Sequence, residues 1–130
     1  MKYYCTYCCK NKIQTLEKVP AIDLYISKRI KSVYQKSKED NFGFIILSGK
    51  FGFLFPEDKI PYYDKLLVES EVQDLSLKLS DFIIKNNISE ITFFYRDFSE
   101  DKNVINYYNA VKLACEISKI KFLSNLIEKK

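Results

Sequence analysis

Short runs of strand-forming residues alternate with longer helical patterns along the chain, and this alternation is the feature that most constrains its fold. Residues 2–8, 42–48 and 91–95 have the length and residue types of strands, and residues 120–123 indicate a short fourth one. Apolar residues recur at helical spacing from Pro20 to about Lys38, from 72 to 83 and from 104 to 115. Such alternation is typical of β-α-β units. We therefore expect a single α/β domain over residues 1–130, a three-layer sandwich with a mostly parallel sheet of about four strands and helices on both faces.

Local signals mark where two of these helices begin. Pro20, with Asp23 in the first turn, predicts the start of the first helix. Ser70 and Gln73 have the spacing of a capping box, which predicts the start of the second. Residues 56–67, which contain two prolines, are expected to form an ordered loop or a single turn of helix.

The chain contains no histidine, which removes whole classes of mechanism. Serine and cysteine nucleophile systems that use histidine, and metal sites with histidine ligands, are excluded. Any general base must be a carboxylate, lysine, tyrosine or thiolate. The 21 basic and 17 acidic residues give a net charge of +4, which permits a nucleic-acid partner without requiring one.

Four cysteines bear on compartment and chemistry: Cys5, Cys8, Cys9 and Cys115. The first ten residues are too short and polar for a signal peptide, and no apolar run is long enough to span a membrane. We expect reduced thiols, a cytoplasmic location and no membrane partner. Cys5 and Cys8 have zinc-site spacing but lack a second pair, so we expect no metal, and we expect no cofactor. A thiol-redox role of Cys8 and Cys9 stays a minor alternative, with lysines beside Cys9 favouring its thiolate.

Ligands of parallel sheets bind beyond the carboxyl ends of the strands. That rule selects residues 9–12, 48–53, 95–97 and 124–125. The richest of these segments lies within L-S-G-K-F-G-F-L-F-P at residues 47–56. Gly49 and Gly52 allow a tight turn, Ser48 offers a hydroxyl and Lys50 a cation, which together suit a phosphate or a nucleobase. The alternative is an ordinary glycine turn with Lys50 in water.

Four motifs follow one another in the first half of the chain. They are C-C-K-N-K at residues 8–12, P-A-I-D-L-Y-I-S at 20–27, I-L-S-G-K-F-G-F-L-F-P at 46–56 and I-P-Y-Y-D at 60–64. In their order and spacing the chain resembles a family of small prokaryotic and phage domains of unknown function. That family is related to the YaaA-type peroxide-stress proteins, and its architecture is similar to the uracil-DNA-glycosylase-like fold.

The resemblance implies a pocket at the strand ends that binds a nucleobase, nucleotide or nucleic acid, with N-glycosidase-like chemistry as a further expectation. Asp64 and Lys50 are the implied catalytic residues. The expected ligand-binding residues are Cys9, Lys12, Tyr25, Ser48, Gly49, Gly52, Tyr62, Tyr63 and Arg96. The alternative is a non-enzymatic DNA-binding or stress-protection module, in which Lys28, Lys31 and Lys38 on the first helix contact phosphates.

Overall fold

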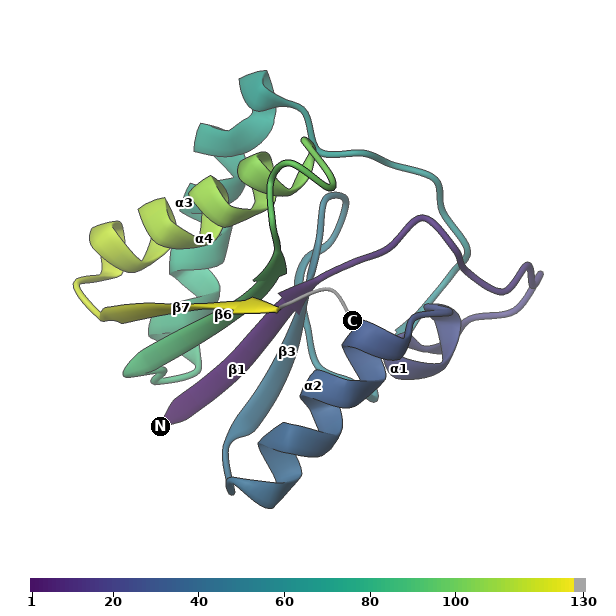
Figure 1. Ribbon diagram of the computed structural model, residues 1–130, viewed down its shortest axis with the longest axis horizontal. Helices are drawn as coiled ribbons and strands as arrows, with labels where there is room; N and C mark the ends of the chain where they lie inside the picture. The colour runs from purple at the N-terminus through teal and green to yellow at the C-terminus, as the bar shows by residue number, and fades with distance from the viewer. Residues whose placement is uncertain (128–130) are drawn as a thin grey trace.

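A five-stranded mixed sheet forms the centre of the computed structural model, which describes residues 1–127 (Figure 1). The strand order is β4-β3-β1-β6-β7, with β4 antiparallel to β3 and the other strands parallel. The α/β class and the mostly parallel sheet are confirmed, with five strands instead of about four. The strands are β1 (Lys2–Tyr7), β3 (Gly43–Ser48), β4 (Gly52–Leu54), β6 (Glu90–Arg96) and β7 (Lys121–Ile127).

Three long helices pack on this sheet: α2 (Lys28–Glu39), α3 (Val72–Lys85) and α4 (Val104–Ser118). Helix α2 contacts β1 and β3, and the ring of Tyr34 lies 5.1 Å from that of Phe44. Helices α3 and α4 pack on each other, and they contact β4 and the β6–β7 pair respectively. Among residues 1–127, every helix is too short or too polar to cross a lipid bilayer.

The prediction of one continuous helix from Pro20 to Lys38 is wrong. Helix α1 (Ala21–Leu24) ends after one turn, and Tyr25 is extended and forms an isolated bridge with Lys12. Ser27 then caps α2, because its hydroxyl accepts the backbone N–H of Ile30 at 3.2 Å. Tyr25 would be buried in one continuous helix and is buried in the observed extended segment as well. The spacing of apolar residues therefore does not reveal the break between α1 and α2.

The start of α3 also differs from the prediction. A 3-10 turn, η1 (Glu69–Glu71), leads into the helix, and Ser70 makes no capping bond. Instead the Glu71 carboxylate accepts the backbone N–H of Val68 at 3.1 Å and binds the Lys65 ammonium at 2.6 Å. The preceding loop is ordered as expected, and one part of it, β5 (Lys59–Ile60), pairs with β2 (Val19–Pro20).

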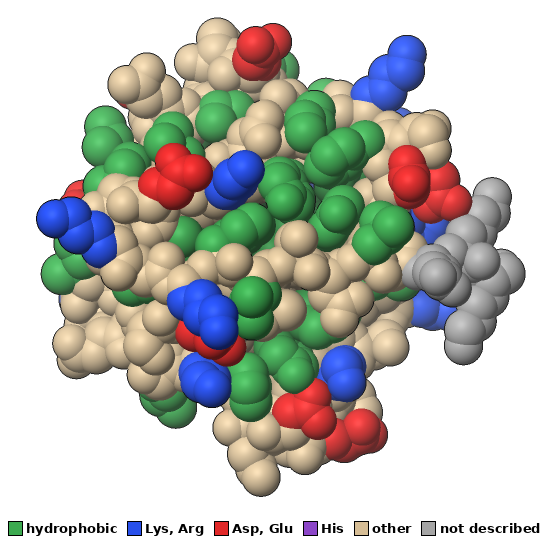
Figure 2. Space-filling view, turned by 60° about the vertical axis from the view of Figure 1, so that its left-hand side comes forward, with side chains coloured by type: hydrophobic (Ala, Val, Ile, Leu, Met, Phe, Trp, Pro, Cys, Tyr) green, Lys and Arg blue, Asp and Glu red, His purple; other side chains and the backbone are tan. Residues whose placement is uncertain are grey.

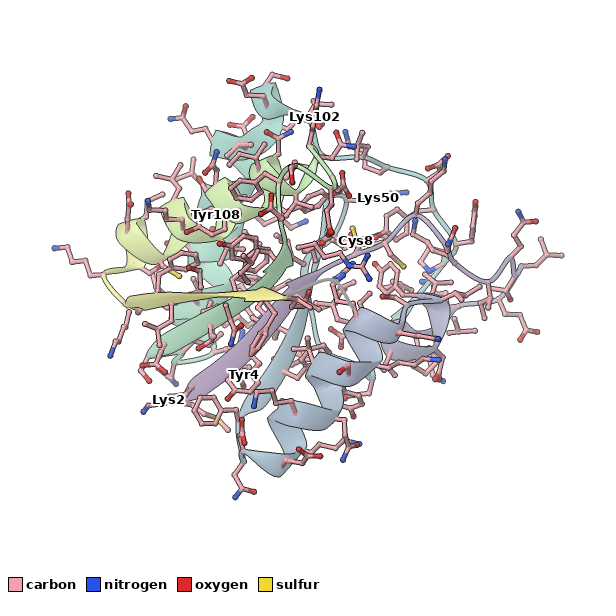
Figure 3. All side chains as sticks on the ribbon, in the orientation of Figure 1. Lys2, Tyr4, Cys8, Lys50, Lys102 and Tyr108 are labelled. Carbon is pink, nitrogen blue, oxygen red and sulfur yellow. The ribbon has the colours of Figure 1, made fainter. Side chains whose placement is uncertain are left out.

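The order of the strands places a crevice at the end of β1. After β1 the chain continues to β3 on one side and returns through β6 on the other, so β1 lies at the topological switch point. In Figure 3, Lys2 lies near the amino end of β1, and Cys8 lies at the opposite, carboxyl end of the sheet. Ligands of open α/β sheets bind at this position.

Candidate functional site

A cleft of about 890 Å³ opens at the carboxyl ends of β1 and β6. It is lined by the loop after β1, the start of α2, residues 64–66, the loop after β6 and Tyr107 of α4. Two of the four segments selected by the strand-end rule contribute to it, through residues 9–12 and Arg96. Residues 48–53 do not line the cleft, because β4 turns back along β3. Residues 124–125 lie within β7, which extends further than predicted.

Arg29, in the first turn of α2, is the most constrained cation of the cleft. Its Nη1 donates to the Thr6 hydroxyl and to the Tyr7 carbonyl, both at 2.7 Å. Its guanidinium carbon lies 3.7 Å from the centre of the Tyr7 ring. A guanidinium has five N–H donors, two of them on Nη1, so the donors on Nε and Nη2 are not used by these bonds. Among residues 1–127, no carboxylate forms an ion pair with Arg29.

Arg96, at the end of β6, is the second arginine of the cleft. Its backbone N–H donates to the Tyr7 hydroxyl at 3.4 Å, so Tyr7 contacts both arginines. Burial lowers the pKa of the Arg29 guanidinium, and the charge of Arg96 acts in the same direction. A guanidinium carries its positive charge throughout the physiological pH range. Two permanent positive charges therefore influence each other at the carboxyl end of β1.

The cleft as a whole is basic. Six basic side chains line it against the three acidic ones of Asp64, Glu100 and Asp101, and the Lys65 ammonium is already bound to Glu71. The first turn of α2 contains no acidic residue. Helix N-termini favour negative charge, and here the first turn carries cations instead. An anion in the cleft would thus be attracted by side chains and by the helix dipole. The six basic residues are Lys10, Lys12, Lys28, Arg29, Lys65 and Arg96.

Residues 61–68, which we call the strap, form one wall of the cleft. Buried Leu67 anchors the strap: its N–H donates to the Tyr107 hydroxyl at 3.1 Å, and its carbonyl accepts the Asn106 side chain at 3.3 Å. Tyr63 is buried too, whereas Asp64 and Leu66 are exposed and line the cleft. Three consecutive residues of the strap, 64–66, thus line the cleft between the two buried residues Tyr63 and Leu67.

A chain of buried hydroxyl groups holds the strap to the β3–β4 turn. The Ser48 hydroxyl donates to that of Tyr63 at 2.9 Å, and the Tyr63 hydroxyl lies 2.5 Å from that of Tyr25. The Ser48 oxygen also accepts the N–H groups of residues 50 and 51. Burial raises the pKa of both tyrosines above its usual value, so both phenols are neutral at physiological pH. In this arrangement the hydroxyl groups of Ser48, Tyr25 and Tyr63 form hydrogen bonds with one another. Ligand binding by these three residues stays a prediction.

The two glycines of this turn have structural requirements of their own. Gly52 has a φ of 81°, a conformation that side chains other than glycine rarely adopt. A Cβ on Gly49 would lie 3.2 Å from the Leu67 nitrogen, so glycine allows the strap to approach the turn. Lys50 is exposed outside the cleft lining, with its ammonium 5.3 Å from the Phe51 ring (Figure 3). The predicted catalytic pair is therefore split: Asp64 lines the cleft and Lys50 does not.

Lys12 and Tyr62 occupy different positions relative to the cleft. The Lys12 ammonium lies 4.6 Å from the centre of the Tyr63 ring and faces the cleft. Tyr62 is 40% exposed but lies outside the lining, so it does not stack over the cleft in this arrangement. Of the three lysines assigned to a DNA-binding face, Lys28 lines the cleft, and Lys31 and Lys38 do not.

Cys9 lines the cleft but is not activated. Its thiol donates to the Asn11 carbonyl at 3.0 Å. Burial raises the pKa of the Cys9 thiol, which outweighs the opposite effect of Arg29 and Lys12. Among residues 1–127, no three cysteine or carboxylate side chains converge to hold a metal ion.

Two other surface features, an apolar patch and a second hollow, bring fewer charged side chains together than the cleft does. Apolar side chains gather over α4 and β7 (Figure 2), where Ile117, Leu123 and Leu126 are exposed. A second hollow, of about 470 Å³, lies between α3 and α4. Within residues 1–127, its lining contains one charged side chain, that of Glu69.

Sequence reasoning missed Arg29, Tyr7 and Tyr107, which build the centre of the cleft. A signal for the first was present, because Arg29 and Arg96 are the only arginines among the 21 basic residues. Arginine and lysine are not interchangeable where planar, bidentate hydrogen bonding is needed. Comparison of the chain with protein-family models, with curated proteins and with solved structures gave no match. The resemblance to the YaaA-type proteins therefore stays a prediction.

Proposed function

We propose that this protein binds a nucleotide or nucleic acid in the cleft at the carboxyl ends of β1 and β6, with a phosphate on Arg29. The observation that carries the proposal is the Arg29 guanidinium, which is held by Thr6 and Tyr7 and has no acidic partner among residues 1–127. Taking a charge out of water is costly unless another charge compensates it. A phosphate would supply that charge and accept the remaining N–H donors in a bidentate arrangement.

The rim of the cleft suits the other part of a nucleotide. Ile26 and Leu66 are 55% and 51% exposed, and both line the cleft, one from the segment before α2 and the other from the strap. Apolar side chains of this kind can hold a base while the cations hold the phosphate. The volume lies in the usual range of small-molecule sites.

The proposal extends to the layer arrangement, the cellular compartment and a cleavage reaction that involves Asp64. We take α2 and the α3–α4 pair as the outer layers of a three-layer sandwich, and the cytoplasm, which keeps cysteines reduced, as the compartment. If the ligand is also cleaved at its N-glycosidic bond, Asp64 is the carboxylate we assign to activating water, because it is exposed on the strap and lines the cleft.

Isothermal titration with the four 5′-ribonucleoside monophosphates, a single-stranded oligonucleotide and a duplex tests the proposal. Arg29→Met is expected to lower the affinity at least tenfold. Arg96→Met is the second variant, because the Arg96 side chain makes no hydrogen bond with residues 1–127 and its loss should not disturb folding. Lys31→Met, on the exposed side of α2, is the matched control and should bind normally.

Failure of every probe to bind would refute the proposal. Duplex binding that is weakened by Lys31→Met and unaffected by Arg96→Met would favour the DNA-binding alternative. Chromatography of the same mixtures detects released base, and release that Asp64→Asn abolishes is the result expected for glycosidic cleavage.

A further inference from the structure

The two arginines contact one aromatic side chain, and among residues 1–127 neither forms an ion pair with a carboxylate. Tyr7 stacks under the Arg29 guanidinium, and its hydroxyl accepts the backbone N–H of Arg96. Because Tyr7 is buried, with its ring stacked on that of Tyr107 at a centroid distance of 5.9 Å, the Arg29 guanidinium and the Arg96 backbone are tied to the end of β1. The guanidinium of Arg29 is held in place, and the exposed side chain of Arg96 lines the same cleft, so two positive charges serve it.

A single negative charge does not compensate two positive ones. An internal phosphodiester carries one negative charge, whereas a terminal phosphate carries close to two at neutral pH and exposes three oxygens. A terminal phosphate is also sterically suited to the partly buried Arg29, because chain continues from it on one side only. A phosphodiester continues on both sides and exposes two non-bridging oxygens.

We infer that the cleft selects ligands with a terminal phosphomonoester, bound between Arg29 and Arg96, over nucleosides and phosphodiesters. The inference rests on the proposed function and names the ligand class of the same site. Free mononucleotides and the 5′-phosphorylated ends of single strands share this chemistry. The apolar rim formed by Ile26 and Leu66 would contact the base in both cases.

The test compares ligands that share a base and differ in the phosphate. Isothermal titration is run with 5′-AMP, 3′,5′-cyclic AMP and adenosine, and then with tetrathymidylate carrying either a 5′-phosphate or a 5′-hydroxyl. We expect 5′-AMP to bind at least tenfold more tightly than the cyclic diester, and the phosphorylated oligonucleotide at least tenfold more tightly than its hydroxyl counterpart if strand ends are the source. Arg96→Met should reduce each preference to less than threefold.

The pH dependence gives a second readout. The second pKa of a terminal phosphate is about 6, so lowering the pH from 7.5 to 5.5 should weaken 5′-AMP binding by about fourfold and leave cyclic AMP unaffected. The titratable and charged groups that line the cleft with Arg29 come from β1 and the loop after it, α2, the strap, the end of β6 with the loop that follows, and α4. They are Tyr7, Cys8, Cys9, Lys10, Lys12, Lys28, Asp64, Lys65, Arg96, Glu100, Asp101 and Tyr107. The chain has no histidine, the residue whose ordinary pKa falls in this interval.

The possible outcomes distinguish a failure of the phosphomonoester selectivity from a failure of the proposed nucleotide binding. Equal binding of 5′-AMP, cyclic AMP and adenosine would overturn the inference and leave nucleotide binding intact. Binding of none of the probes would overturn both. If the Arg96→Met variant kept its preference for the monoester, the inference would also be overturned, because the selectivity would then arise from other groups.

Discussion

Tyr63→Phe tests whether the buried hydroxyl chain stabilises the wall of the cleft. The substitution keeps the ring and removes only the hydroxyl that joins Ser48 and Tyr25. Both partners are fully buried, so the Ser48 proton and the Tyr25 hydroxyl would each lose a partner that water cannot replace. Each buried group left unsatisfied costs about 1–3 kcal/mol, so we expect the free energy of unfolding to fall by about 3 kcal/mol. For a chain of this size that lowers the melting temperature by roughly 10 °C.

Urea unfolding followed by circular dichroism measures this loss. Tyr62→Phe is the matched control. The side chain of Tyr62 is 40% exposed, and its hydroxyl makes no hydrogen bond with residues 1–127. The control should change the free energy of unfolding by less than about 0.5 kcal/mol, as exposed substitutions usually do. If Tyr63→Phe were equally mild, the hydroxyl chain would contribute no net stability, and the argument that it anchors the strap would be refuted.

Two further predictions follow from the pKa shifts. Burial raises the pKa of Tyr25, Tyr63 and Tyr107 above the ordinary value of about 10, so the stability associated with them is present below pH 10 and is lost as the pH rises further. Each should lower the free energy of unfolding by about 1.4 kcal/mol per pH unit in that range, and urea midpoints that stay constant between pH 9.5 and 11.5 would contradict the shifts. Because burial also raises the pKa of Cys9, the native protein should react with iodoacetamide at pH 7.5 at least tenfold more slowly than free glutathione, as followed by mass spectrometry. Rapid alkylation of Cys9 would restore the redox alternative.

The parts of the fold that could be predicted are those in which local pattern and tertiary environment agree. The apolar run at residues 42–48 became β3, and the helical spacing at residues 72–83 became α3. The missed break before α2 depends on the bridge between Tyr25 and Lys12, a contact across thirteen positions of the chain that periodicity does not encode. β4 was missed because three residues after a glycine turn show too little alternation to separate a strand from a loop.

The candidate site shows the same division. The strand-end rule selected residues 9–12 and Arg96, which line the cleft, because parallel strands joined by β-α-β connections end at the same edge of the sheet. It could not indicate that Ser48 turns inward, since that depends on how the strap folds back and brings Tyr63 to the turn. Arg29 was passed over for a different reason. Its neighbours Lys28 and Lys31 make it look like part of a solvated basic helix, and only its contacts with Thr6 and Tyr7 distinguish it.

The composition of the chain bears on how such a cleft operates. A binding site that contains histidine can change its charge near neutral pH, but a site built on arginine cannot. The charge at Arg29 is therefore constant across the physiological range, and so is the free-energy cost of keeping it partly buried without an acidic partner. The ligand is then the component whose charge can vary. For a terminal phosphate with a second pKa of about 6, binding weakens as the pH falls below neutrality because the ligand loses charge while the protein keeps its own.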